Sequence, residues 1–157
     1  MTEALSPVAA TIPAMHHPWR FFRSLTEWTL HWTHLPAGTL GVTDHDARTI
    51  TLTRGMTQAQ RRCTIAHEVE HAVAGPVLET HREREERRVE AAAARRLLPD
   101  PHVVADALVW ARGDLEAAAD ELWVDEPTLR ARLDARHLHP AERAIIVARV
   151  NALEVGA

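Results

Sequence analysis

One short stretch, from Cys63 to Gly75, constrains the fold of this chain more than any other. It reads CTIAHEVEHAVAG and contains the pattern H-E-x-x-H. Thr57 is a suitable N-cap before it, apolar residues recur through it at helical spacing, and a Gly-Pro pair at its end is a typical helix stop. The sequence therefore predicts a helix from Thr57 to Ala74, with one apolar side turned towards a core.

Two histidines of this predicted helix share one face. Residues four apart on a helix lie one above the other, so His67 and His71 present their imidazoles to a single point. A zinc ion needs such an arrangement. Glu68 lies on the adjacent face, where it can take a proton from a water held by the ion. The spacing predicts a zinc site with His67 and His71 as ligands and Glu68 as the catalytic base; the alternative is two surface histidines on an amphipathic helix.

A catalytic zinc ion usually has three protein ligands, so a third is required. A third histidine six residues after His71 is ruled out, because that position is Val77. A charged run precedes and opens the next predicted helix, His81–Leu98, and it supplies carboxylates at Glu79, Glu83, Glu85, Glu86 and Glu90. Glu86 and Glu90 share a helix face. Glu86 could therefore bind zinc while Glu90 accepts a hydrogen bond from the far nitrogen of a ligating histidine.

Composition narrows the class of protein. The net charge of −4 argues against a dominant role in binding nucleic acid. The single cysteine, Cys63, excludes an internal disulfide framework and fits a reducing cytoplasm. No apolar run is long enough for a membrane span, and the first residues lack the features of a signal peptide. We expect a cytoplasmic protein without a membrane anchor, in which Cys63 is a half-buried structural residue although it continues the stripe of the two histidines.

The first part of the chain predicts a mixed domain. Residues 1–17 are rich in alanine, threonine and proline, and we expect a flexible leader. A helix is predicted over 18–28, with an apolar stripe that covers the core. Three strands separated by turns are predicted at Leu30–Leu35, Thr39–Thr43 and Thr49–Thr53. These elements predict an α+β domain over residues 18–99, in which a small antiparallel meander lies beside the H-E-x-x-H helix.

The remainder of the chain, residues 100–157, predicts a helical region. Its helices are expected at Pro101–Ala111, Leu115–Leu122, Thr128–Arg136 and Pro140–Leu153. Residues 114–136 resemble a helix-turn-helix segment. Arg130, Arg132 and Arg136 would make the second helix of that segment a candidate recognition helix on DNA. Neighbouring acidic residues argue against direct DNA binding, and we expect this segment to pack on the rest of the protein or to dock a partner protein.

Three segments of the chain resemble the ImmA/IrrE family of small zinc metallopeptidases. Arg61–Ala72 resembles the family's H-E-x-x-H stretch, with Glu70 in place of the usual glycine. Glu86–Pro99 is similar to the family pattern E-x-x-A-[ND]-x-[FW]-A-x-x-L-L-x-P, with Ala92 in place of the aromatic residue. Ala118–Leu133 is similar to the segment that follows the peptidase helices in this family.

The resemblance implies a zincin-like peptidase of the phage, mobile-element or actinobacterial type. Its activity would be the zinc-dependent cleavage of a partner helix-turn-helix repressor in phage immunity or stress regulation. By resemblance, His67, His71 and Glu86 bind Zn²⁺ and Glu68 is the general base. The alternative hypothesis is a zinc-binding regulatory protein without proteolytic activity, which acts through its helix-turn-helix-like segment.

Overall fold

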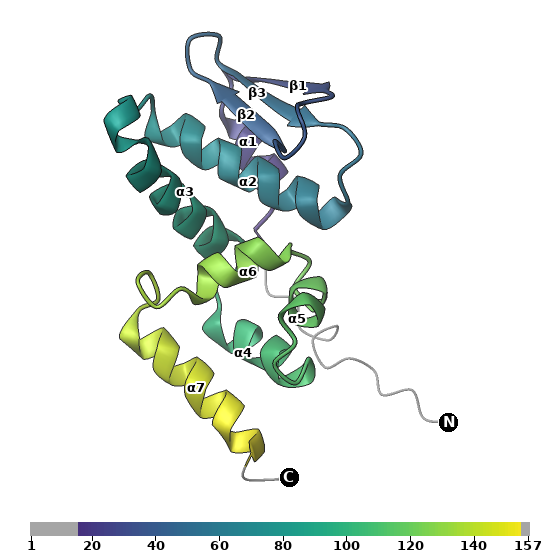
Figure 1. Ribbon diagram of the computed structural model, residues 1–157, viewed down its shortest axis with the longest axis vertical. Coiled ribbons are helices and arrows are strands. Elements are labelled where there is room, and N and C mark those ends of the chain that lie inside the picture. Colours follow the sequence, from purple (N-terminus) through teal and green to yellow (C-terminus); the bar gives the residue numbers. More distant parts are fainter. Residues whose placement is uncertain (1–15, 155–157) are drawn as a thin grey trace.

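A computed structural model describes residues 16–154, and the predicted leader lies outside them except for His16 and His17. The predicted α+β class is confirmed. A three-stranded sheet and helix α1 cover one side of the long helix α2, and a group of helices covers the other side (Figure 1). None of the described helices is both long and apolar enough to cross a membrane.

The elements follow one another closely along the chain. In order they are α1 (Pro18–Ser24), β1 (Thr29–Thr33), β2 (Gly41–Asp44), β3 (Thr49–Thr53), α2 (Gln58–Ala74), the short 3₁₀ helix η2 (Glu79–His81), α3 (Arg82–Leu97), α4 (Pro101–Trp110), α5 (Leu115–Glu121), α6 (Glu126–Leu133) and α7 (Pro140–Glu154).

Helix α2 begins and ends where the sequence predicts. The hydroxyl of Thr57 accepts a hydrogen bond from the backbone N–H of Gln60, and the Gln60 side chain accepts one from the backbone N–H of Thr57. This reciprocal pair satisfies two N–H groups that the first helical turn leaves free. At the other end Gly75 adopts φ of 84°, a conformation that favours glycine and stops the helix.

The predicted antiparallel meander is wrong. The strand order is β1-β3-β2, and β1 runs parallel to the central strand β3, whereas only β2 is antiparallel to it. The connection from β1 to β2 is too long for a tight hairpin, and it passes the end of β3. There Thr53 donates its backbone N–H to Leu40 and Arg54 donates to Thr33. As a result β2 is an edge strand, and it lies against α2.

Two groups of buried apolar side chains lie on opposite sides of α2. Ile65 and Val69 pack with Ile50 and Leu52 of β3, and aromatic residues of α1 and β1 cover this group. Cys63 and Ala66 face the other way and pack with residues of α3 to α7. Because the second group includes residues on both sides of position 99, the predicted core 18–99 and the helical region 100–157 share apolar packing. The division of the chain at residue 99 into a core and a helical region stays a prediction.

The helix-turn-helix-like segment is present as α5 and α6, but α6 spans Glu126–Leu133 rather than 128–136. It starts early because the carboxylate of Asp125 accepts a hydrogen bond from the backbone N–H of Thr128, and proline is tolerated in a first helical turn. It ends at Leu133 because the next residue, Asp134, has an extended backbone.

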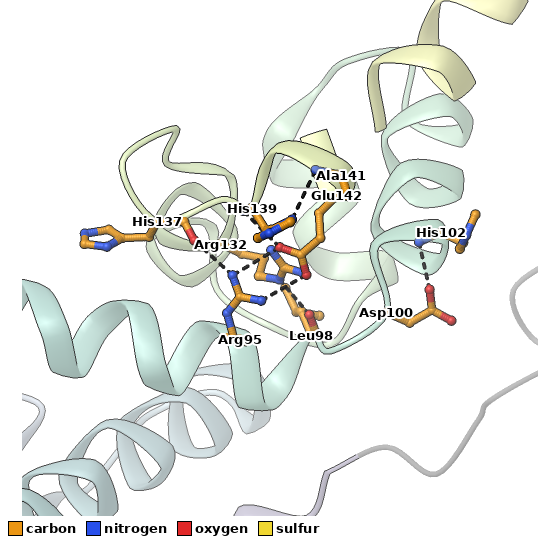
Figure 2. A network of polar contacts seen from close by, with 9 residues as sticks. All are labelled: Arg95, Leu98, Asp100, His102, Arg132, His137, His139, Ala141 and Glu142. Atoms are coloured by element: carbon orange, nitrogen blue, oxygen red, sulfur yellow. Dashed lines mark hydrogen bonds and ion pairs between the residues drawn. The ribbon is translucent and has the colours of Figure 1, made fainter. Parts of the chain in front are cut away.

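The side chain of Arg132 in α6 connects this helix to α7 and to the end of α3. Arg132 has a side chain that is only 1% exposed, and it donates to the carbonyl of Leu98 and to the carboxylate of Glu142 in α7. Arg95 of α3 donates two hydrogen bonds to the same carboxylate. Figure 2 shows these contacts converging from α3, α6 and α7. Arg132, one of the three arginines considered for DNA contact, is therefore not available at the surface.

Candidate metal centre

Two histidines of α2 and one glutamate of α3 converge on a single point. The Nε2 atoms of His67 and His71 lie 3.1 Å apart. The Oε1 atom of Glu86 lies 2.8 Å from Nε2 of His67, and its Oε2 atom lies 3.1 Å from Nε2 of His71. The side chains of His67, His71 and Glu86 are 24%, 22% and 44% exposed, so the cluster is partly accessible to solvent.

The separations suit a metal ion at the centre of the three donors. Zinc bonds to nitrogen and oxygen are about 2.0–2.1 Å long, which places neighbouring ligands of a tetrahedral ion roughly 3.3 Å apart. The observed separations of 2.8–3.1 Å lie close to that value. The donor set of two imidazoles and one carboxylate also has the chemistry of a catalytic zinc site, with the fourth position left for water. The residues present therefore fit the ion.

The other carboxylates considered as a third ligand are not grouped with the two histidines. Glu79, Glu83 and Glu85 form ion pairs with arginines one turn further along the chain, at Arg82, Arg87 and Arg88. Glu90 is exposed, and no hydrogen bond within residues 16–154 joins it to His67 or His71. Glu86 is the glutamate that the structure groups with the two histidines. The predicted contact of Glu90 with a ligating histidine stays a prediction.

Glu68 lies beside this cluster in a more buried position, with 6% of its surface exposed. Its Oε2 atom accepts a hydrogen bond of 2.7 Å from the hydroxyl of Thr43 on β2, which also lies 3.1 Å from the backbone carbonyl of Glu68. Burial raises the pKa of the Glu68 carboxyl, and the Thr43 hydrogen bond and the charge of His67 oppose part of that rise. Glu68 is thus a buried carboxyl that one hydrogen bond from β2 holds beside the cluster.

One cleft of about 1070 Å³ is lined by Glu68 together with His67, His71 and Glu86. The cleft is lined by β2 and the segment before it, by α2, by α3 and by α6. β2 contributes apolar side chains that are partly exposed, such as Leu40 just before the strand and Val42 within it. A cleft of this size that runs along an edge strand can hold an extended peptide next to the histidines.

Cys63 lines this cleft but is not grouped with His67, His71 and Glu86. It is 5% exposed, and its sulfur accepts a hydrogen bond from the backbone N–H of Asp125 at the start of α6. Burial raises the pKa of the thiol to about 11, so it stays protonated at neutral pH. The thiol is more buried than the half-buried residue we expected, and its contacts are structural.

Two contacts of this region were not predicted from the sequence. The sequence places Thr43 in a predicted strand and does not indicate a contact with Glu68. The signal was that Gly41 and Thr43 are two residues apart and therefore share one face of β2. Glu70 was noted only for replacing a glycine. It is 8% exposed and pairs with Arg96 of α3, whose guanidinium lies over the ring of Phe21 in α1. Acidic and basic residues on neighbouring predicted helices are the signal that could have suggested this pair.

Comparison with known proteins identifies the family. The model of the peptidase M78 family, described as the IrrE N-terminal-like domain, matches residues 25–136, well over half of the 157-residue chain. This match includes the sheet, the H-E-x-x-H helix and the helix-turn-helix-like segment. No curated protein and no solved structure matches the chain. The chain thus belongs to the IrrE-like peptidase family M78.

Proposed function

We propose that this protein is a zinc-dependent metalloendopeptidase, in which His67, His71 and Glu86 hold the ion and Glu68 is the general base. The convergence of three donor atoms beside a buried glutamate is the observation that carries the proposal. Membership of a peptidase family and a cleft of about 1070 Å³ beside the edge strand support the same conclusion.

The ion would supply a Lewis acid that lowers the pKa of water and polarises the scissile carbonyl. Glu68 then takes a proton from the attacking water on its carboxylate and returns it to the nitrogen of the leaving amine. The edge strand β2 aligns the substrate backbone, and apolar side chains such as Val42 contact its side chains.

The proposed substrate is a partner transcriptional repressor with a helix-turn-helix domain, as the resemblance to the ImmA/IrrE family implies. We also propose that the protein acts in the cytoplasm, in phage or mobile-element immunity or in stress regulation. Helix α6 supports a protein partner rather than DNA. Its residues Thr128, Arg130 and Ala131 line the peptidase cleft, so a partner held there contacts this helix.

Zinc content tests the first part of the proposal. The purified protein should contain about one zinc ion per chain by elemental analysis, and His67→Ala and Glu86→Gln should each lose most of it. Glu83→Gln is the matched control for Glu86→Gln, because it removes the same charge from the same helix at an exposed ion pair. Absence of bound zinc after reconstitution would reject the proposal, as would equal zinc loss in the control.

Peptide cleavage tests the second part. The zinc-loaded protein is incubated with a diverse library of unstructured peptides, and cleaved bonds are identified by mass spectrometry. We expect cleavage at a narrow set of sequences, and we expect Glu68→Gln to keep its zinc and lose cleavage by several orders of magnitude. Zinc binding without cleavage by the wild-type protein would instead favour the non-proteolytic regulatory protein.

A further inference from the structure

We propose that Thr43 and Gly41 of the edge strand β2 position the carboxylate of Glu68 for catalysis. The inference rests on the proposed peptidase function, in which Glu68 is the base. Thr43 and Gly41 lie outside the H-E-x-x-H pattern, and we assign to them the orientation of the Glu68 carboxylate. Neither residue touches the reacting atoms, so both are positioning residues.

The hydroxyl of Thr43 fixes one oxygen of the base. It lies 2.7 Å from Oε2 of Glu68 and 3.1 Å from the backbone carbonyl of the same residue. A hydroxyl has one hydrogen, and the shorter contact to the charged oxygen is the stronger of the two. Within residues 16–154 no other side chain donates a hydrogen bond to this carboxylate. Glu68 therefore depends on one strand residue for the orientation of its carboxylate.

Gly41 leaves room for the other oxygen. A Cβ atom at this position would lie 2.7 Å from both Cγ and Oε1 of Glu68, and 2.8 Å from Cγ2 of Thr64. All three contacts are shorter than Cβ atoms show in real structures, and Glu68 and Thr64 lie four residues apart on the same face of α2. Any larger residue at position 41 would therefore displace the Glu68 side chain or separate β2 from α2.

The two strand residues act on Glu68 together. Gly41 and Thr43 are two residues apart, so they share one face of β2. That face packs against α2 and contacts the Glu68 side chain. The Thr43 hydroxyl occupies Oε2, which leaves Oε1 as the oxygen without a side-chain donor in the described structure. A glutamate has three rotatable bonds, and a buried one needs such contacts to stay in a productive rotamer. β2 thus lines the substrate cleft and orients the base at the same time.

Three variants and a control separate positioning from folding. Thr43→Val keeps the size and shape of the side chain but removes the hydroxyl, whereas Thr43→Ser keeps the hydroxyl and removes a methyl group. Gly41→Ala adds the obstructing atom. Thr51→Val is the matched control, because Thr51 lies on the neighbouring strand β3, opposite Val42, and makes no described contact with Glu68.

Two measurements are made on the zinc-loaded proteins. The first is kcat and KM on a peptide found in the library screen. The second is the affinity for acetohydroxamic acid by calorimetry, since a hydroxamate would chelate a bound zinc ion and its proton could be shared with the neighbouring carboxylate of Glu68. It needs no peptide substrate, and Glu68→Gln defines the full loss of that contact. A hydrogen bond to a charged group is worth about 1.5–3 kcal/mol, which corresponds to a change of roughly 10- to 100-fold.

We expect Thr43→Val to lower kcat about 10-fold or more, with KM and zinc content unchanged, and to weaken acetohydroxamic acid binding by a similar factor. Thr43→Ser should restore most of both values, Gly41→Ala should lose at least as much as Thr43→Val, and Thr51→Val should match the wild type.

The inference is overturned if Thr43→Val keeps the wild-type kcat and acetohydroxamic acid affinity, or if Thr43→Ser is as impaired as Thr43→Val. Loss of zinc from Thr43→Val would also overturn it, because the residue would then support the metal centre and not the base. Failure of the peptidase function gives a different result, since the wild-type protein itself would then bind no zinc or cleave no peptide.

Discussion

Replacing Glu142 with glutamine should destabilise the whole protein, because it removes the charge that balances a buried arginine. The Arg132 side chain is 1% exposed, and its Nη2 atom lies 2.9 Å from Oε1 of Glu142. Removing one partner of a buried ion pair costs about 3–5 kcal/mol. Glutamine keeps one acceptor, and the second partner, Arg95, is 47% exposed, so solvent screens part of its pairing with Glu142. We therefore expect a loss of about 3 kcal/mol in the free energy of unfolding.

Thermal unfolding followed by circular dichroism measures this loss. Unfolding entropy near the midpoint is about 2.1 cal/mol/K per residue, so 3 kcal/mol lowers the Tm of a chain of this length by roughly 9 °C. Glu83→Gln is the control, because Glu83 is 89% exposed and its ion pair should contribute less than about 1 kcal/mol. The double variant Arg132→Met with Glu142→Leu should recover much of the stability, since no charge is then left buried.

The ion pair of Arg132 with Glu142 should also make stability depend on pH. Burial alone would raise the pKa of Glu142, but the hydrogen bonds from Arg95 and Arg132 outweigh it and leave the pKa below its ordinary value. A lowered pKa in the folded state stabilises the protein above the pKa of the unfolded chain, and this contribution disappears as the pH falls through the folded value. The difference between the wild type and Glu142→Gln should be constant above about pH 4.5 and shrink below it. A Tm change equal to that of Glu83→Gln, or a difference that grows in acid, would refute the argument.

Three further results are expected. Iodoacetamide should alkylate Cys63 of the native protein at pH 8 roughly 100-fold more slowly than in the unfolded chain, because a thiol pKa of about 11 leaves little thiolate. Mass spectrometry measures both rates, and equal rates would contradict this prediction. Glu70→Gln should lower the free energy of unfolding by about 1–2 kcal/mol in urea titrations, because Arg96 loses a charged partner, yet keep its zinc; zinc loss would show that the pair also supports the metal site. Gel shifts at low salt should detect no DNA binding, since Arg130 and Arg136 are paired with acidic neighbours; a shift lost in Arg130→Glu with Arg136→Glu would argue for a DNA partner.

The H-E-x-x-H helix illustrates how far local pattern can lead. Its cap, its stop and its two stacked histidines depend on residues within a few positions of one another. Hydrogen bonds of a helix join residues four apart, so Thr57, Gln60 and Gly75 carry the information for both ends. The position of Glu68 next to the histidines follows from the same spacing.

The sheet shows where local pattern fails. The strands themselves were predicted within a few residues, but their order was not. Pairing joins β1 to β3 across a stretch that contains another strand, and no short-range signal states which neighbour a strand chooses. The close approach of Gly41 and Thr43 to Glu68 follows from this order, so it could not be predicted either.

By itself, then, the amino-acid sequence determined the α+β class, the helix of the candidate site, two of the converging donors and the family. Spacing left five glutamates open and the resemblance implied Glu86, but only the tertiary structure brings Glu86 together with His67 and His71, because this depends on how α3 packs on α2. It also decided that Arg132 is buried rather than exposed. Both outcomes depend on how helices distant in sequence pack, and packing is a property of surfaces that meet only in the folded chain.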